Sequence, residues 1–294
     1  MTGADSAASP SRRPVIGVGF LLAPCILLVA WLIGLPLLNL LYESFRAYEA
    51  GSVGAAEDAA MTLQNYRELL HPAYFGFLWD TIWISGLSAL LALFFGFLIA
   101  YRIARTRSKL VRKTYLILFV ALMFLSVLVR VYAIVLTFGP GGIGEVLIDF
   151  LGVRTNSRAY AEAMVILGFL HYLVPIATLM LVGTIQNVNP SYCEAAVSLG
   201  ATRWQAHLGT TLPLASRGLI SAFLIVFSLA VSSFVIPLIL GRGKVQFLAN
   251  LAYARFSEVA NYPSGAAIAM VLLVMSLILV AAVSRIGRSR SVAA

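Results

Sequence analysis

Residues 163–187 read AMVILGFLHYLVPIATLMLVGTIQN, and this stretch decides the fold class. Its 25 residues include no Lys, Arg, Asp or Glu. Roughly 20 apolar residues in a helix cross the hydrocarbon core of a bilayer, so the stretch predicts a membrane-spanning helix. Five more stretches of similar length and apolarity lie at 15–41, 81–101, 114–137, 218–241 and 266–284, and Arg130 in 114–137 is the single charged residue among them. The sequence therefore predicts an all-α polytopic membrane protein with six transmembrane helices.

The composition of the 294-residue chain supports this fold class. Hydrophobic residues make up 61% of the chain and charged residues 11%, whereas a soluble domain carries about 25% charged residues. A soluble fold of this size has too little interior to bury so much apolar surface. The composition excludes a soluble enzyme, a disordered chain and a nucleic-acid binder, and it makes membrane lipid the main solvent.

The basic residues indicate how the helices are oriented. The N-terminal tail, the loop after the second stretch, the loop after the fourth and the C-terminal tail hold 13 of the 21 Lys and Arg residues. The segment between the first two stretches instead holds six acids and only Arg46 and Arg67 as bases. Basic loops stay on the cytoplasmic side, so both termini are expected in the cytoplasm of a bacterial-type inner membrane. The last outer loop, with Arg242, Lys244 and Arg255 against Glu258, departs from this pattern.

This layout divides the chain into a cytoplasmic tail (1–14), a six-span transmembrane domain (15–284) and a second cytoplasmic tail (285–294). Arg12 and Arg13 faintly resemble a twin-arginine signal, and residues 22–25 a lipoprotein cleavage site. The apolar run continues well past Cys25, and Pro24 stands where such a site needs a small residue. The first stretch is therefore expected to remain as a membrane helix.

Sequence patterns typical of enzymes match this chain only in part or in unsuitable surroundings. Residues 139–144 fit G-x-G-x-x-G, but they follow a membrane stretch and contain Pro140, which indicates a loop that ends a helix. Gly243 and Lys244 lack the flanking residues of a phosphate-binding loop. The three histidines lie in separate segments and the two cysteines far apart, which predicts no catalytic residue, no metal site and no disulfide.

The most informative segment is the cytoplasmic loop 189–213, which reads NPSYCEAAVSLGATRWQAHLGTTLP. Ser191 with Glu194 and Thr202 with Gln205 each fit a capping box, and Gly200 lies between them. Glycine adopts the left-handed conformation that ends a helix at little cost. The loop is expected to form two short helices and to serve as a docking element, with Pro213 at the entry to the fifth stretch.

The spacing in this loop resembles the EAA loop of ABC-importer permeases. The matching residues are Glu194, Ala195, Ala196, Gly200, Leu212 and Pro213. The family usually has isoleucine three residues before the proline, where this chain has Thr210. Short segments at 63–66, 129–133 and 261–267 are similar to the spermidine/putrescine-type branch.

This resemblance implies the MetI-like permease fold and a transport subunit that is not itself an enzyme. It implies as partners a second permease subunit, in a homodimer or heterodimer, two cytoplasmic ATP-binding subunits and an extracytoplasmic solute-binding protein. No cofactor is expected on this chain, since ATP would be bound by the partner subunit. The loop helix that carries Glu194 would sit in a cleft of the ATPase, where Glu194 either pairs with a basic residue or completes its own capping box.

Candidates for the translocation path are Arg130, Tyr132, Ser232 and Ser233. A permanent charge inside a span is costly and marks a functional position, so Arg130 is expected to face the interior or an interface. The alternative is that its side chain reaches the outer headgroups. The solute is expected to be a polyamine; iron, an anion or another small solute stays open because no acid lies in the middle of a span. A secondary transporter would show internal repeats and intramembrane acids, and neither is evident.

Overall fold

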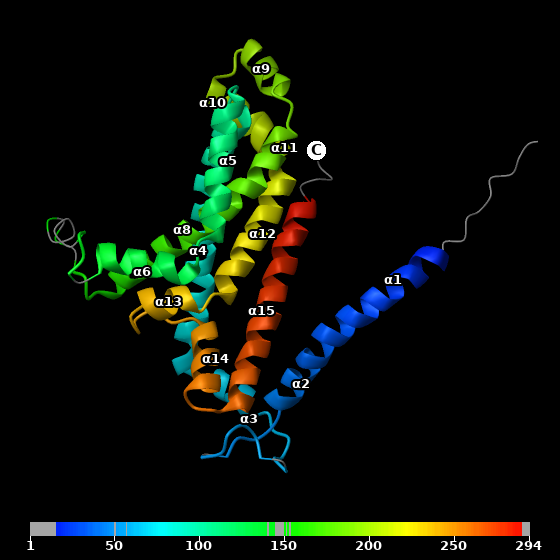
Figure 1. The fold of residues 1–294 in the computed structure, drawn as a ribbon, viewed down its shortest axis with the longest axis vertical. Helices are drawn as coiled ribbons and strands as arrows, with labels where there is room; N and C mark the ends of the chain where they lie inside the picture. Colours follow the sequence, from blue (N-terminus) through cyan, green and yellow to red (C-terminus); the bar gives the residue numbers. More distant parts are fainter. Residues whose placement is uncertain are drawn as a thin grey trace, which may run out of the picture.

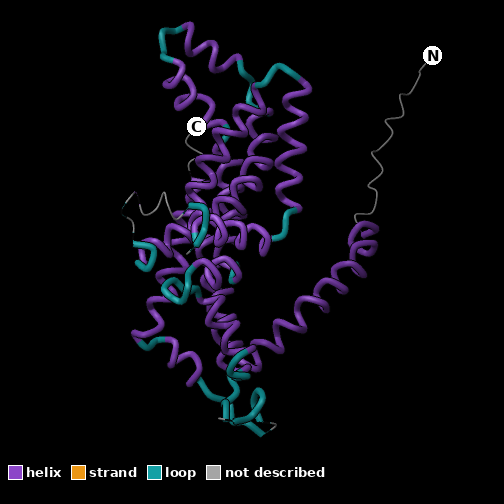
Figure 2. The backbone as a smooth tube through the Cα atoms, turned by 60° about the vertical axis from the view of Figure 1, so that its left-hand side comes forward, coloured by secondary structure: helices purple, strands orange, loops and turns teal. Residues whose placement is uncertain are grey.

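The computed structural model describes residues 16–49, 51–56, 58–139, 141–144, 150, 152 and 154–289. In these ranges the chain consists of helices and loops (Figure 2), and its one extended pairing is an isolated bridge between Arg46 and Met61. The predicted tail 1–14, residues 290–294 of the second tail, Pro140 of the glycine-rich loop and the acids Glu57, Glu145 and Asp149 lie outside the described residues.

Four helical stretches are long and apolar enough to cross a membrane, and two bent helix pairs bring the number to six if each pair is one span. The first long stretch runs through α1 (Ile16–Val29), the π-helical turn η1 (Ala30–Gly34) and α2 (Leu35–Ser44). The other three are α4 (Pro72–Arg105), α8 (Arg158–Gln186) and α15 (Tyr262–Ser289). These four helices correspond to four of the six predicted stretches, and shorter helices form the other two, so the all-helical membrane fold is confirmed.

The third predicted span is not one straight helix. It consists of α5 (Lys109–Phe124) and α6 (Val127–Phe138), which meet at an angle of 93°. Leu125 between them has an extended backbone, and Ser126 has a non-helical one. No glycine or proline marks this break, and the prediction of an unbroken helix over 114–137 is wrong there. The physical reason lies in tertiary packing, because α6 turns to lie against α8 and α13 (Val235–Leu240).

The fifth predicted span is also interrupted. Its main helix, α12 (Ser216–Ser232), stops before Ser233 and Phe234, and α13 follows them. The Phe234 carbonyl accepts a hydrogen bond from Asn250 Nδ2 at 2.7 Å, and the Phe247 N–H donates to Asn250 Oδ1 at 3.0 Å. The amide of Asn250 thereby joins the break to the start of α14 (Leu248–Ser257). An apolarity pattern cannot predict a polar contact of this kind.

The core of the subunit is the contact between α4 and α8, which we call the α4–α8 seam. Small residues recur on the buried face of α4 every three or four positions, at Ser85, Ser88, Ala92, Gly96 and Ala100. A Cβ added at Gly96 would lie 2.8 Å from the Cβ of Ala177, so the two backbones approach as closely as glycine permits. Small residues bring membrane helices together in this way.

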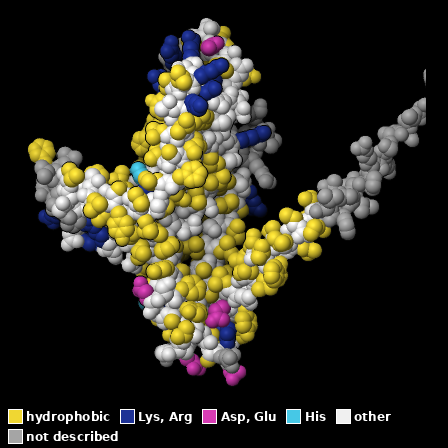
Figure 3. Space-filling view, viewed as in Figure 1, with side chains coloured by type: hydrophobic (Ala, Val, Ile, Leu, Met, Phe, Trp, Pro, Cys, Tyr) yellow, Lys and Arg dark blue, Asp and Glu magenta, His cyan; other side chains and the backbone are white. Residues whose placement is uncertain are grey.

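The molecule has two opposite ends (Figure 1). The short helices α9 (Ser191–Ser198) and α10 (Arg203–Ala206) lie at one end, and α14 and α3 (Gln64–Leu69) lie at the other. Lys and Arg side chains gather near α9, whereas Asp and Glu side chains lie mostly toward the opposite end (Figure 3). The α1–α2 stretch touches the rest near α15 and then leans away from the bundle (Figure 1).

Candidate functional site: coupling segment and path residues

The segment 189–213, which we call the coupling segment, forms the two short helices that the sequence predicts. After them the chain continues through the π-helical turn η2 (His207–Thr211) and α11 (Leu212–Leu214), which contains Pro213. A proline supplies no N–H to the preceding turn, and a widened turn precedes both Pro213 here and Pro36 in the first span.

Gly200 ends α9 in the predicted left-handed conformation, with φ +93°. The Gly200 N–H donates to the Val197 carbonyl at 3.0 Å, and the Ala201 N–H donates to the Ala196 carbonyl at 3.1 Å. These two bonds are those of a Schellman motif, in which the last free carbonyls of a helix are satisfied by the turn itself. The turn directs the chain sharply from α9 into α10.

One of the two predicted capping boxes is present and the other is wrong. The Gln205 N–H donates to Thr202 Oγ1 at 3.3 Å, and the Thr202 N–H donates to Gln205 Oε1 at 3.0 Å, which is a complete box. At α9 the helix begins at Ser191 itself, and the Asn189 side chain accepts from the Ser191 N–H at 3.0 Å. Glu194 therefore does not complete a box of its own, and its side chain is exposed.

The coupling segment presents an apolar surface to its surroundings. No residue of α9 is buried. Tyr192, Leu199 and Trp204 are 56%, 90% and 65% exposed. Ala195 and Ala196 add small side chains on the same helix, and Ala195 is exposed. A short helix with a small-residue surface and large apolar neighbours is suited to close contact with another protein.

The departure at Thr210 from the family's usual isoleucine has a local role. The Thr210 hydroxyl donates to the Ala206 carbonyl at 2.6 Å, within the widened turn. Leu212 is partly exposed and Thr211 is buried. The threonine thus supplies a hydrogen bond inside the turn where the family's residue would supply only packing.

Arg130 is buried in the protein, with 2% of its surface exposed, so the alternative of a side chain reaching the headgroups is wrong. Its Nη1 donates to the His171 carbonyl at 3.3 Å, and the guanidinium lies 5.6 Å from the centre of the Tyr172 ring. In a regular helix the N–H of residue 175 would bind that carbonyl, but residue 175 is Pro175, which has none. Arg130 fills the position of the missing donor.

The sequence contains an indication of this contact between Arg130 and the His171 carbonyl, although the apolarity pattern alone does not reveal it. A proline in the middle of a span leaves one carbonyl without its helical donor, and a buried arginine on a neighbouring helix is a strong donor. The Arg130 Nε and Nη2 atoms are also buried, and neither has a hydrogen-bond partner. A guanidinium in this state is costly, so Arg130 stays a candidate for a functional position.

The other three path candidates do not lie with Arg130. Tyr132 is 55% exposed on α6, and Ser232 is exposed with its hydroxyl bonded to the Ser228 carbonyl of its own helix. Ser233 lies at the break of the fifth span. The buried Arg130 therefore differs from Tyr132 and Ser232, which are exposed, and from Ser233, which is partly buried.

Near the break lies an aromatic pair that no sequence pattern indicated. Phe234 stacks on Tyr253 of α14 with ring centres 5.2 Å apart, and the two rings are 37% and 40% exposed. Ring faces attract cations. The carboxylates of Asp80 and Glu162 are less available to a cation, because both pair with Arg158.

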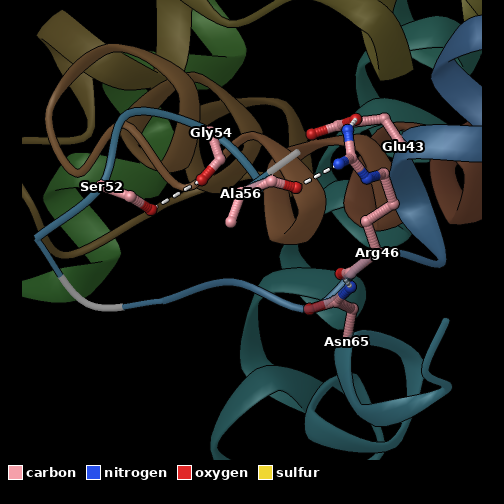
Figure 4. Close-up of polar contacts among 6 residues, drawn as sticks. All are labelled: Glu43, Arg46, Ser52, Gly54, Ala56 and Asn65. Carbon is pink, nitrogen blue, oxygen red and sulfur yellow. Dashed lines mark hydrogen bonds and ion pairs between the residues drawn. The ribbon is translucent and has the colours of Figure 1, made fainter. Parts of the chain in front are cut away.

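Polar contacts fold the loop between the first two spans (Figure 4). Asn65 Nδ2 donates to the carbonyls of Ser44 and Arg46, both at 2.9 Å. The Arg46 guanidinium pairs with Glu43 and donates to the Ala56 carbonyl. Among the described residues, no three His, Cys, Asp or Glu side chains are grouped so that they could hold a metal ion.

Residues 92–291 match the family described as "Binding-protein-dependent transport system inner membrane component". The spermidine/putrescine transport system permease PotB of Escherichia coli (strain K12) is 28% identical over 258 residues, which are 86% of this chain and 92% of that protein. PotB of Haemophilus influenzae is 28% identical over 222 residues, which cover 75% of this chain and 77% of the relative. The ferric permease FbpB of Actinobacillus pleuropneumoniae is 28% identical over only 47% of this chain and 20% of its own length.

Among solved structures, a chain of a bacterial ABC transporter that imports alginate aligns with a TM-score of 0.75 at 19% identity, covering 93% of this chain and 97% of that one. A chain of the MetNI methionine transporter aligns with a TM-score of 0.53 at 17% identity, covering 75% and 98%. These structural similarities support the fold. The family assignment rests on the match over residues 92–291, which is more than half of the chain. The chain belongs to the binding-protein-dependent transport system inner membrane components, the permease subunits of ABC importers.

Proposed function

We propose that this permease imports a polyamine such as spermidine or putrescine, and that an ATPase subunit drives it by docking on the coupling segment. The observation that carries the proposal is the geometry of α9, an exposed short helix that a Schellman turn holds at one end of the molecule. Glu194, Ala195, Ala196 and Gly200 would form the docking surface, and Leu212 and Pro213 would connect it to the fifth span. The ATP would be bound by that partner.

The proposed solute rests on the relatives and on the chemistry of the path. Two relatives named as spermidine/putrescine permeases match over most of their length, whereas the ferric permease matches over a fifth of its own. The exposed Tyr132 and the Phe234–Tyr253 pair supply ring faces that suit an alkylammonium group. A solute-binding protein outside the membrane would supply the selectivity that this chain's paired carboxylates do not.

A second permease subunit would cover the surface of the first span. None of the residues in the most apolar part of that span is buried. An apolar groove of about 490 Å³ lies between α2 and α15, lined by Leu41, Met270, Val274 and Ile278 among others. The second subunit, identical or different, would enclose the translocation path with this one.

The proposed orientation places the coupling segment and both termini in the cytoplasm, which the basic residues near α9 favour (Figure 3). Cys193, which is partly exposed on α9, tests this directly. A membrane-impermeant thiol reagent should label Cys193 in inside-out vesicles and not in intact cells. Labelling from the outside would reverse the orientation.

The decisive experiment is reconstitution of the permease with its partner permease, an ATPase subunit and a solute-binding protein from the same organism. Spermidine-loaded binding protein should raise ATP hydrolysis and drive uptake of labelled spermidine, whereas ferric ion and alginate should not. Uptake of a different solute would agree with an ABC importer and would contradict the proposal that the solute is a polyamine.

A matched pair of glycine variants tests the docking surface. Gly200→Val forces a branched side chain into the left-handed region and should lower ATPase binding, because the turn after α9 opens. Gly209→Ala in the same segment has no such backbone conformation and has space for a Cβ, so it should bind normally. Equal binding by both variants would count against docking through α9.

A further inference from the structure

The cytoplasmic end of α4 contacts the coupling segment at two points, directly before its first residue and at His207. Arg105 Nη2, in the last turn of α4, donates to the Val188 carbonyl at 2.8 Å, directly before the segment begins. One turn earlier, the Tyr101 hydroxyl lies 3.2 Å from His207 Nε2, where η2 begins. The Arg105 guanidinium also lies 5.9 Å from the centre of the Tyr101 ring, so these two contacts are adjacent.

His207 carries the contact onward to α9. Its Nδ1 lies 3.4 Å from Cys193 Sγ and 3.3 Å from Thr211 Oγ1. The Tyr101 and His207 rings also meet edge to face, with centres 4.9 Å apart. In either neutral tautomer one ring nitrogen donates and the other accepts, so the imidazole can bond toward α4 and toward the coupling segment at once.

Polar contacts matter here because packing contributes little. No residue of α9 is buried, and α10 buries only Ala206. The chain itself connects the coupling segment to α8 before it and to α12 after it. The contacts of Tyr101 and Arg105 connect the segment to a third helix, α4, which does not neighbour the segment in sequence. Since α4 is packed backbone to backbone on α8 at Gly96, a displacement passed to α4 moves the central seam.

We propose that Tyr101, Arg105 and His207 form a clamp through which α4 follows the coupling segment when the ATPase moves α9. These are positioning residues, since they act on the spans and not on the solute. The clamp rests on the proposed docking of the ATPase on the coupling segment. It assigns a role in coupling to three side chains that lie outside the EAA spacing.

The test measures solute taken up per ATP hydrolysed, with the full complex in proteoliposomes. Tyr101→Phe removes one hydroxyl and keeps the ring, and His207→Asn keeps an amide near the position of Nδ1 and withdraws the group that faces Tyr101. Each should lower the uptake-to-hydrolysis ratio about three- to tenfold, as the loss of one hydrogen bond allows. The double variant should be no worse than either single one, because both remove the same contact.

Arg105→Gln should lower the ratio by a similar factor, and Arg105→Lys should restore part of it because it keeps a charged donor. Arg102→Gln is the matched control at the same helix end, where the side chain is exposed. Tyr115→Phe is the matched control for hydroxyl removal, on the exposed face of α5. Both controls should leave the ratio unchanged.

An unchanged ratio in Tyr101→Phe and His207→Asn would overturn the clamp, as would a double variant whose effects add. A fall in assembled complex with an unchanged ratio would also overturn it, because that result describes a purely structural contact. If the wild-type permease bound no ATPase, the proposed docking itself would be refuted. The two failures are therefore distinguishable.

Discussion

The α4–α8 seam and the coupling segment are held in place by opposite means. In the seam, Gly96 lies directly against Ala177, and α8 also buries Leu173 and Phe169 completely. In the coupling segment, α9 buries nothing, and hydrogen bonds from side chains and turns fix its course. The difference indicates that the seam sets the stability of the subunit, while the coupling segment can move without unfolding it.

The largest difference in the free energy of unfolding is expected when a leucine is replaced by alanine in each of the two regions. Leu173→Ala removes a side chain with no exposed surface and should lower the free energy of unfolding by about 2–5 kcal/mol. Leu199→Ala removes one that is 90% exposed at the end of α9, and it should change that free energy by less than about 0.5 kcal/mol. Denaturant unfolding of the purified subunit in detergent measures both values. Equal losses would show that the coupling segment is part of the same packed core.

A smaller effect is expected for glycine substitutions within α4. Gly96→Ala places a Cβ 2.8 Å from the Ala177 Cβ, so the helices must separate, and unfolding should become easier by about 1–3 kcal/mol. Gly86→Ala on the same helix meets nothing within 4 Å. It should be neutral or stabilising by up to about 1 kcal/mol, since alanine favours a helix more than glycine does. A thermal unfolding series in one detergent compares the two variants, and destabilisation by Gly86→Ala would contradict the seam as described.

Much of this contrast could be predicted from the sequence, and its limits have physical causes. Apolar length identified the helices, and the spacing of Glu194, Gly200 and Pro213 identified the coupling segment. The break at Leu125 and Ser126 could not be found, because no glycine or proline marks it and packing on α8 produces it. The box at Ser191 was wrong because Asn189, two residues before it, accepts the N–H that starts the helix.

The bond from Arg130 to the His171 carbonyl gives a third test, inside the membrane. Pro175→Ala supplies the missing N–H, so the carbonyl no longer depends on Arg130. The effect of Arg130→Met should therefore differ between the wild-type chain and the Pro175→Ala variant by about 1 kcal/mol, the value of a hydrogen bond in this environment. A double-mutant cycle on unfolding in detergent measures this coupling. Pro24→Ala, in the remote first span, should be additive with Arg130→Met, and additivity of Pro175→Ala would refute the contact.

The smallest effect is expected at the two helix starts of the coupling segment. Thr202→Ala removes the acceptor of the Gln205 N–H and should weaken α10 by about 0.5–1 kcal/mol. Ser191→Ala should have almost no effect, because the Ser191 side chain does not cap α9. Hydrogen exchange at residues 203–206 measures the local change, and global unfolding should stay constant for both variants.

Thr202→Ser provides the control, because it keeps the hydroxyl and should keep the slow exchange. If Thr202→Ala lowered the free energy of global unfolding as much as a seam variant does, the coupling segment would unfold together with the core and could not move separately from it. If only the local exchange increases, the segment is a separately stabilised unit. Its polar contacts then determine how it moves relative to the spans, and its packing does not.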